Sequence, residues 1–136
     1  MKIEFFHNNF LNKINQSSIY KNKTDYPKIS IVMPSYNKVK FIERSILSIL
    51  NQDYPNTELI IIDGGSDDGT IDIIKKYDHK ISYWVSEKDQ GQSDALNKGF
   101  NHCSGEIYGW LNSDDLYLPN AFKNAMSVFE KNLKKK

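Results

Sequence analysis

The sequence has one cysteine, three histidines and no long apolar run. A single cysteine excludes a disulfide within the chain and is typical of a reducing compartment. No stretch approaches the ~20 apolar residues that a membrane-spanning helix needs, and the polar, Asn-rich start lacks the apolar segment of a signal peptide. We therefore expect a cytoplasmic protein. We expect no histidine metal site, because the three histidines are widely separated in the sequence.

Charge of one sign is lacking as well. The 18 Lys and Arg residues are matched by 17 Asp and Glu residues, which leaves a net charge of +1. A chain this close to neutral has no overall field that would attract nucleic acid or a membrane surface. We therefore expect no nucleic-acid partner, and any ligand must be recognised by a local group of side chains. The 136 residues suit one domain.

Two common nucleotide-binding motifs are also missing. No G-x-G-x-x-G follows the first apolar run, and G-x-x-x-x-G-K-[ST] does not occur. The acidic loop 63–69 does not fit an EF-hand, because the sixth position counted from Asp63 is Asp68 where that motif requires Gly. A dinucleotide fingerprint, a P-loop and a calcium loop are therefore excluded.

From Lys28 onward, short runs of β-branched residues alternate with amphipathic segments. This alternation is typical of βαβ units, so we predict an α/β fold with a mainly parallel four-stranded sheet flanked by helices. The predicted strands are Ile29–Met33, Glu58–Ile62, Ile81–Val85 and Ile107–Leu111. Residues 1–26 are polar without a sustained period, so we treat them as an N-terminal extension and place the domain at 27–136.

Apolar residues at helical spacing predict helices around residues 42–50, 71–77 and 96–103, and we expect Cys103 in the core. A last helix combines lysines at 123, 131 and 134–136 with one apolar face: Phe122, Met126, Phe129 and Leu133. Such a basic amphipathic helix either contacts anionic lipid at the inner face of a membrane or packs on the sheet with its lysines in water.

A polar cluster follows each predicted strand. The four clusters are residues 34–37, 63–69, 88–94 and 112–115. In open α/β sheets ligands bind beyond the carboxyl ends of the strands. We therefore expect the four clusters to converge on one crevice.

The last cluster ends in two adjacent carboxylates, Asp114 and Asp115. Mg²⁺ and Mn²⁺ prefer oxygen ligands, and Mg²⁺ is commonly held by one or two carboxylates together with the phosphates of a substrate. The pair therefore predicts a Mn²⁺ or Mg²⁺ site for a diphosphate. The alternative is that the two aspartates cap the next helix or fill a turn.

The other clusters supply further candidates. Asp63 ends a strand and can accept hydrogen bonds from a base or a ribose, whereas Asp67 and Asp68 are more typical of a turn and an N-cap. In the third cluster Asp94 begins a helix whose positive end favours an anionic ligand, and Lys98 one turn later would reach a diphosphate. Lys98 as a solvated helix residue is the alternative.

Three stretches, Ile29–Asn37, Ile60–Thr70 and Asp89–Leu118, together resemble the nucleotide-sugar-binding half of a family 2 glycosyltransferase with the Rossmann-like GT-A fold. The similarity extends over about residues 27–130, with several motifs in the same order. It implies a nucleoside-diphosphate-sugar donor based on UDP, GDP or TDP, and transfer with inversion to an acceptor that these residues do not identify. It also implies Mn²⁺ or Mg²⁺ on the diphosphate.

The resemblance assigns roles by position. Asp63 would hydrogen-bond the base, Asp115 would bind the metal, and Asp114 would contact ribose or phosphate or share the metal. It identifies no catalytic residue. The base and ribose pocket would be lined by four consecutive residues: Pro34, Ser35, Tyr36 and Asn37.

The sequence departs from the family pattern at two positions, because Gly64 and Asn112 stand where acidic residues are usual. The family's acceptor-binding half, with its general base, should also follow the last helix. A positioned base typically contributes about 10²–10⁴-fold to the rate. We therefore expect a C-terminally truncated domain that associates with itself or with a partner chain.

Three functions remain open. The first is a glycosyltransferase domain completed by another polypeptide, and the second is an inactive nucleotide-sugar-binding remnant. The third is a metal-dependent nucleotidyltransferase, which would need a basic, Gly-rich loop after the first strand. Residues 34–38 contain no Gly and one Lys, which disfavours the third function.

Overall fold

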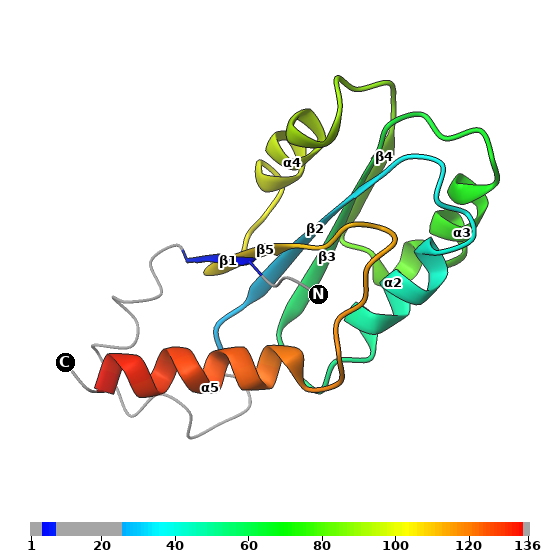
Figure 1. The fold of residues 1–136 in the computed structure, drawn as a ribbon. Coiled ribbons are helices and arrows are strands. Elements are labelled where there is room, and N and C mark those ends of the chain that lie inside the picture. Colours follow the sequence, from blue (N-terminus) through cyan, green and yellow to red (C-terminus); the bar gives the residue numbers. More distant parts are fainter. Residues whose placement is uncertain (1–3, 8–25, 135–136) are drawn as a thin grey trace.

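The computed structural model describes residues 4–7 and 26–134, with side chains in 26–129 (Figure 1). Its centre is a sheet with four parallel strands: β2 (Ile29–Ser35), β3 (Thr57–Asp63), β4 (Tyr83–Ser86) and β5 (Ile107–Trp110). Each of the four predicted strands is present. The predicted α/β fold with a four-stranded parallel sheet is therefore confirmed.

A fifth strand, β1 (Glu4–His7), pairs antiparallel with β5, so that the strand order is β1-β5-β2-β3-β4. It lies in the segment that the sequence analysis treats as a polar N-terminal extension, where no strand was predicted. The pairing places Glu4 opposite Trp110 and His7 opposite Ile107. A four-residue edge strand has no periodic signal of its own, because its backbone hydrogen bonds depend on an edge formed about 100 residues later in the sequence.

Helices cover both faces of the sheet (Figure 1). The apolar side chains of α4 (Gln92–Phe100) pack with Val32 and Ile60 on one face. On the other face, Ile31, Met33 and Ile61 pack with three helices: α2 (Ile42–Leu50), α3 (Thr70–Lys76) and α5 (Ala121–Lys134). All seven residues of β2 are buried, because a central parallel strand is covered on both sides.

Two predicted boundaries differ from the structure. The strand β4 begins at Tyr83 instead of the predicted Ile81, because Asp78–Lys80 forms a 3₁₀ turn just before it. The helix predicted through Cys103 ends at Phe100, so Cys103 lies in the following turn, where it is half-buried against the α4 side of the core. Burial raises the pKa of the Cys103 thiol to about 11, so it stays protonated at neutral pH.

The helix α5 packs on the sheet, which was one of the two expectations for it. Phe122 and Met126 are buried in the core, and Phe129 packs against it. Leu133 and the last lysines lie outside the described side chains. Across the part of the chain that the structure describes, no helix combines the length and the apolarity needed to cross a bilayer.

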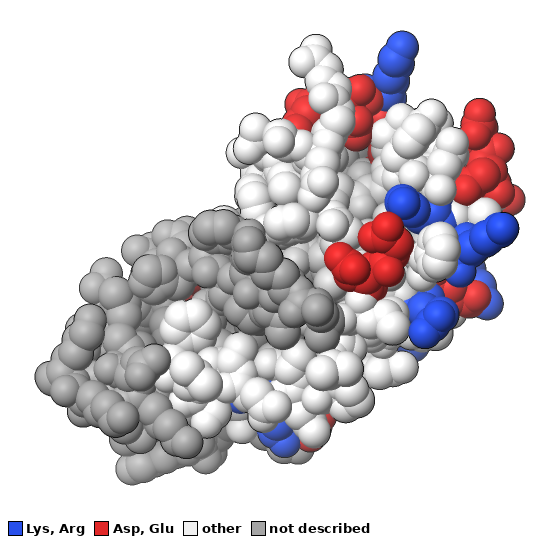
Figure 2. Space-filling view, in the orientation of Figure 1, with Lys and Arg blue, Asp and Glu red and all other residues white. Residues whose placement is uncertain are grey.

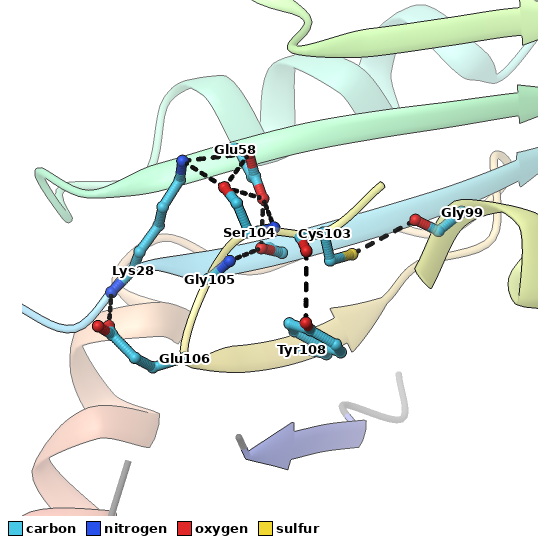
Figure 3. A network of polar contacts seen from close by, with 9 residues as sticks. Lys28, Glu58, Gly99, Cys103, Ser104, Gly105, Glu106 and Tyr108 are labelled. Carbon is cyan, nitrogen blue, oxygen red and sulfur yellow. Dashed lines mark hydrogen bonds and ion pairs between the residues drawn. The ribbon is translucent and has the colours of Figure 1, made fainter. Parts of the chain in front are cut away.

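The amino ends of the strands are tied together by a polar network around Glu58 (Figure 3). The Glu58 carboxylate is 8% exposed and accepts hydrogen bonds from the Ser30 hydroxyl at 2.6 Å and from the Ser104 backbone N–H at 2.6 Å. Lys28 Nζ lies 3.2 Å from it. One buried carboxylate thus joins the starts of β2 and β3 to the turn before β5.

Candidate functional site

A cavity of about 470 Å³ opens beyond the carboxyl ends of β2 and β5, beside the start of α4. Its volume lies within the ~300–1,000 Å³ that small-molecule sites usually occupy. Its walls come from three of the four predicted clusters. The lining residues are Pro34, Ser35, Tyr36, Lys38, Asp89, Gly91, Gln92, Ala95, Asn112, Ser113 and Asp114.

The segment after β2 forms one wall. Tyr36 is 59% exposed, so its ring is available to a ligand, whereas Ser35 is 6% exposed. The buried Ser35 hydroxyl has no hydrogen-bond partner among the described residues. A buried, unsatisfied hydroxyl is costly, commonly by about 1–3 kcal/mol. At a cavity wall, it is therefore a group that a ligand would satisfy.

The second cluster holds this wall in place without lining the cavity itself. Asn37 has a φ of 49°, its backbone N–H donates to the Ser66 hydroxyl at 2.8 Å, and its side-chain oxygen accepts from Asp67 N–H at 2.9 Å. Asp68 accepts from the backbone N–H groups of Thr70 at 3.0 Å and of Val39 at 3.2 Å. Asp67 and Asp68 lie in the turn, as expected, but the N-cap of α3 is Gly69, with a φ of 103°, instead of the predicted Asp68 one position earlier.

Asp63 is fully buried at the end of β3. One carboxylate oxygen accepts from the N–H groups of Gly65 and Ser66 and from the Ser86 hydroxyl, at 3.1, 2.8 and 2.7 Å. The other accepts from the Ser66 hydroxyl at 2.6 Å. In this arrangement Asp63 organises the loop beneath the cavity, and its contact with a base stays a prediction.

The opposite wall carries Asp114, whereas its neighbour Asp115 is exposed but is not among the residues that line the cavity. Asp114 is exposed, and its Oδ2 lies 3.1 Å from Nζ of Lys38 across the cavity. The backbone forms a turn in which Asp115 N–H donates to the Asn112 carbonyl at 3.0 Å, and the Asp115 carbonyl accepts from the Ser45 hydroxyl at 2.6 Å. Figure 2 shows the resulting acidic patch over the loop after β5, with basic side chains beside it.

Neither aspartate is used as a helix cap. Within the described residues, the Asp115 carboxylate has no hydrogen-bond or ion-pair partner, and Asp114 has only the lysine. The start of α5 is instead capped by Gln52, whose side-chain oxygen accepts from Phe122 N–H at 3.2 Å. The backbone of Asp114 and Asp115 therefore forms a turn, as one of the two expectations had it, while neither carboxylate is used to cap a helix.

Asp94 and Lys98 lie outside the cavity wall. Lys98 Nζ lies 3.4 Å from Asp94 and 3.3 Å from Glu87, so its charge is already matched by carboxylates. Asp94 also accepts from the Gln90 backbone N–H at 3.0 Å, and this bond holds the pKa of the Asp94 carboxyl below its ordinary value. The ion pair stabilises the start of α4, and its binding of a nucleotide sugar remains a prediction.

The sequence analysis did not select several residues that line the cavity. Gln92 donates from its amide to the Asn112 side-chain oxygen at 2.9 Å and joins two walls. The Asp89 carboxylate lies against Gly64, where an added Cβ would be 3.0 Å from its Oδ2. Asp89 and Gln92 belong to a predicted cluster, whereas Lys38 lies one residue beyond another. Lys38 would have been selected only if the first cluster had been extended by one residue.

The donor set fits a divalent ion that is shared with a phosphate ligand. Two exposed carboxylates are adjacent in sequence, and the described residues contain no group of three His, Cys, Asp or Glu side chains that would form an all-protein site. Mg²⁺-type ions commonly take one or two carboxylates and complete their shell with water and phosphate oxygens. Asp114 and Asp115 supply that number.

Comparison with known families and structures gives consistent matches. Residues 30–135 match the model of "Glycosyl transferase family 2". An uncharacterized glycosyltransferase of Rickettsia typhi is 38% identical over 111 residues, which cover 82% of this chain and 35% of that protein.

Two solved structures are similar in fold. The crystal structure of S. aureus TarS 1-349 in complex with UDP-GlcNAc matches with a TM-score of 0.69 and 27% identity, covering 76% of this chain and 31% of that one. The mannosyltransferase PcManGT from Pyrobaculum calidifontis, in complex with GDP-Man and Mn²⁺, matches with a TM-score of 0.69 and 25% identity, covering 85% and 36%. The present chain thus spans about a third of the length of the three proteins.

Proposed function

The chain belongs to glycosyl transferase family 2, and from that membership we propose that its cavity binds the nucleoside diphosphate of a nucleotide-sugar donor, with a divalent ion, for inverting transfer of the sugar. One observation carries the proposal. The cavity pairs a buried, unsatisfied hydroxyl on one wall with an exposed carboxylate on the other. A nucleotide sugar supplies hydrogen-bonding groups for the first and, through its ion, a positive charge for the second.

In this proposal the wall after β2 binds the nucleoside. The exposed Tyr36 ring provides a face for the base, and Ser35 donates to or accepts from the base or ribose. Asn37 and Asp63 act from behind by fixing the loops that carry these groups. The nucleoside-bound complexes of TarS and PcManGT, one with a UDP-sugar and one with a GDP-sugar, support a nucleotide-sugar donor.

Asp115 and Asp114 would hold the divalent ion. When bound, such an ion neutralises charge on the departing nucleoside diphosphate. The unpartnered Asp115 carboxylate is the stronger donor, because no charge within the described residues must be displaced from it. The Mn²⁺ in the PcManGT complex supports Mn²⁺ as the ion to test first.

Transfer itself needs a base and an acceptor site. Misplacing reacting groups by about 1 Å can cost about 10²-fold, and losing the base multiplies that loss. Two carboxylates line the cavity among the described residues: Asp114 is assigned to the ion, and Asp89 accepts from the Gly91 N–H at 2.9 Å in the loop before α4. We therefore expect these 136 residues to bind the donor without turning it over.

Calorimetry with UDP, GDP and TDP, each with and without Mn²⁺, tests the donor site. We expect one nucleotide to bind, with an affinity that rises when Mn²⁺ is present. Ser35→Ala should weaken that nucleotide by about fivefold to tenfold, since a hydrogen bond to a buried group is lost. Equal or absent binding in all six titrations would overturn the proposal.

Incubation with labelled nucleotide sugars and a panel of acceptors tests the expected inactivity. Multiple-turnover transfer that Asp115→Asn abolishes would show that the acceptor site and base lie within these 136 residues. A nucleotidyltransferase is not favoured by the cavity, since Lys38 is the single cation among its described lining residues and a triphosphate needs more.

A further inference from the structure

Lys38 places a positive charge in the cavity in addition to the proposed metal ion. Its Nζ lies 3.1 Å from Oδ2 of Asp114, and both side chains line the cavity. They come from segments 76 residues apart in the sequence, after β2 and after β5. The Lys38 ammonium is therefore paired with one of the two carboxylates that would hold the divalent ion.

The backbone of Lys38 is fixed, whereas its side chain is only weakly held. Its N–H donates to the Thr70 hydroxyl at 3.0 Å, and its carbonyl accepts from Phe41 and Ile42 at 2.9 Å each. The ion pair is different, because its two side chains are 38% and 40% exposed. Exposed ion pairs change an equilibrium by about fivefold at most. The ammonium can therefore leave Asp114 at little cost without moving the loop.

We infer that Lys38 is an exchangeable counter-ion of the donor cavity: it neutralises Asp114 while the metal is absent, and it moves to the diphosphate when metal and nucleotide enter. The inference rests on the proposed function. It assigns Lys38 as a positioning and phosphate-binding residue, which neither the family resemblance nor the sequence clusters single out.

Electrostatics gives the direction of the exchange. A divalent ion attracts the Asp114 carboxylate about twice as strongly as an ammonium at the same distance, and it repels that ammonium when both share one carboxylate. The nearest new negative charge is then the diphosphate that arrives with the ion. Lysine suits this movement, because its ammonium is a compact charge on a flexible stem and is a common phosphate ligand.

The first experiment measures Mn²⁺ binding without nucleotide, from the signal of free Mn²⁺ in electron paramagnetic resonance. Lys38→Met removes the competing charge while keeping most of the aliphatic stem. We expect it to bind Mn²⁺ about twofold to fivefold more tightly than wild type. Lys40→Met is the matched control, because Lys40 is exposed and does not line the cavity. The control should leave the affinity unchanged.

The second experiment measures, by calorimetry in the absence of metal, binding of the nucleotide that the donor titrations select, written here as UDP. Asp114→Asn frees the ammonium and removes a negative charge, so metal-free UDP should bind about fivefold more tightly. Adding Lys38→Met to that variant should remove the part of the gain that comes from the freed ammonium. A purely structural role for Lys38 would not produce this reversal, since its backbone contacts are the same in every variant. With Mn²⁺ present, Lys38→Met alone should weaken UDP about tenfold.

The outcomes separate the inference from the proposed function. If wild type binds UDP with Mn²⁺ but Lys38→Met matches wild type in both experiments, the donor site stands and the exchange is wrong. If Asp114→Asn gives no gain that depends on Lys38, the exchange is also wrong. If wild type binds no nucleotide under any condition, the proposed function fails. The pattern of tighter Mn²⁺, a Lys38-dependent gain and weaker UDP–Mn²⁺ would support both.

Discussion

Glu58 at the amino end of the parallel sheet and the pair Asp114 and Asp115 beyond its carboxyl end differ in how their carboxylate oxygens are used. At the amino end, Glu58 is 8% exposed and saturated with donors from Ser30, Ser104 and Lys28 (Figure 3). Beyond the carboxyl end, Asp114 has one exposed ion pair, and the Asp115 carboxylate has no partner within the described residues.

Their environments explain the difference. A buried carboxylate is tolerated only when hydrogen bonds compensate the loss of water, so Glu58 stabilises the fold and has no capacity left for a ligand. An exposed carboxylate contributes little to stability but keeps its oxygens free. Glu58 therefore serves stability, whereas the exposed Asp114 and Asp115 are suited to binding.

The largest effect is expected from Glu58→Ala. The substitution leaves the buried Ser30 hydroxyl and the partly buried Ser104 N–H without their acceptor, so we expect a loss of about 2–4 kcal/mol in the free energy of unfolding. Asp114→Ala should cost less than about 1 kcal/mol. Urea unfolding of both variants checks the contrast. Equal losses would show that the two ends do not differ as described.

Glycine substitutions should give the next largest difference. A Cβ at Gly105 would lie 2.5 Å from the Lys28 backbone carbonyl and from the Ser30 hydroxyl, so Gly105→Ala should cost about 1–3 kcal/mol. A Cβ at Gly64 would meet only the movable Asp89 carboxylate, at 3.0 Å. Gly64→Ala should therefore cost less than about 1 kcal/mol in urea and instead alter nucleotide binding, since Asp89 lines the cavity.

Asp115→Asn should act on binding alone. We expect it to abolish the Mn²⁺-dependent part of nucleotide affinity, a change of at least about tenfold, because the unpartnered ligand oxygen loses its charge. The urea midpoint should stay at the wild-type value. Asp67→Asn serves as control, since Asp67 meets Asn37 through its backbone and not through its carboxylate. If the two variants bind alike, the assignment of metal ligand and turn residue is wrong.

The smallest effect concerns acid. Burial raises the pKa of Glu58, but the hydrogen bonds from Ser30 and Ser104 outweigh it and hold the pKa below the ordinary value of 4.5. A carboxyl with a depressed pKa in the folded state contributes stability above its unfolded pKa and loses it as pH falls through the folded one. Glu58→Gln should therefore unfold with a shallower pH dependence below pH 4.5 than wild type does. An unchanged slope would show that the network does not stabilise the ionised form.

Much of the fold could be predicted from local pattern. The β-branched runs at 29–33, 58–62 and 107–111 match strands within two residues at each end, and the apolar spacing at 42–50 matches α2. These signals are local, because one or two turns of periodic side chains decide which face is buried. The strand β1 carried no such signal, and its place depends on β5.

For the candidate site, the sequence by itself determined which segments lie next to one another. Parallel strands end at the same edge of a sheet, so residues 34–37, 88–94 and 112–115 had to meet there once the four strands were known. That inference needs only chain order and strand direction. Chain order identifies the loops around the cavity, but it identifies only some of the side chains that line it.

Tertiary structure alone decided which side chains remained free for a ligand. Asp63 already accepts hydrogen bonds from Ser66 and Ser86, and Lys98 already pairs with Glu87, and neither is among the residues that line the cavity. Lys38 enters it by pairing with Asp114. Such contacts depend on short-range distances between loops up to 76 residues apart in sequence, and hydrogen bonds and ion pairs weaken steeply with distance. Composition and spacing cannot fix these distances, because they are set only when the packed sheet brings the loops together.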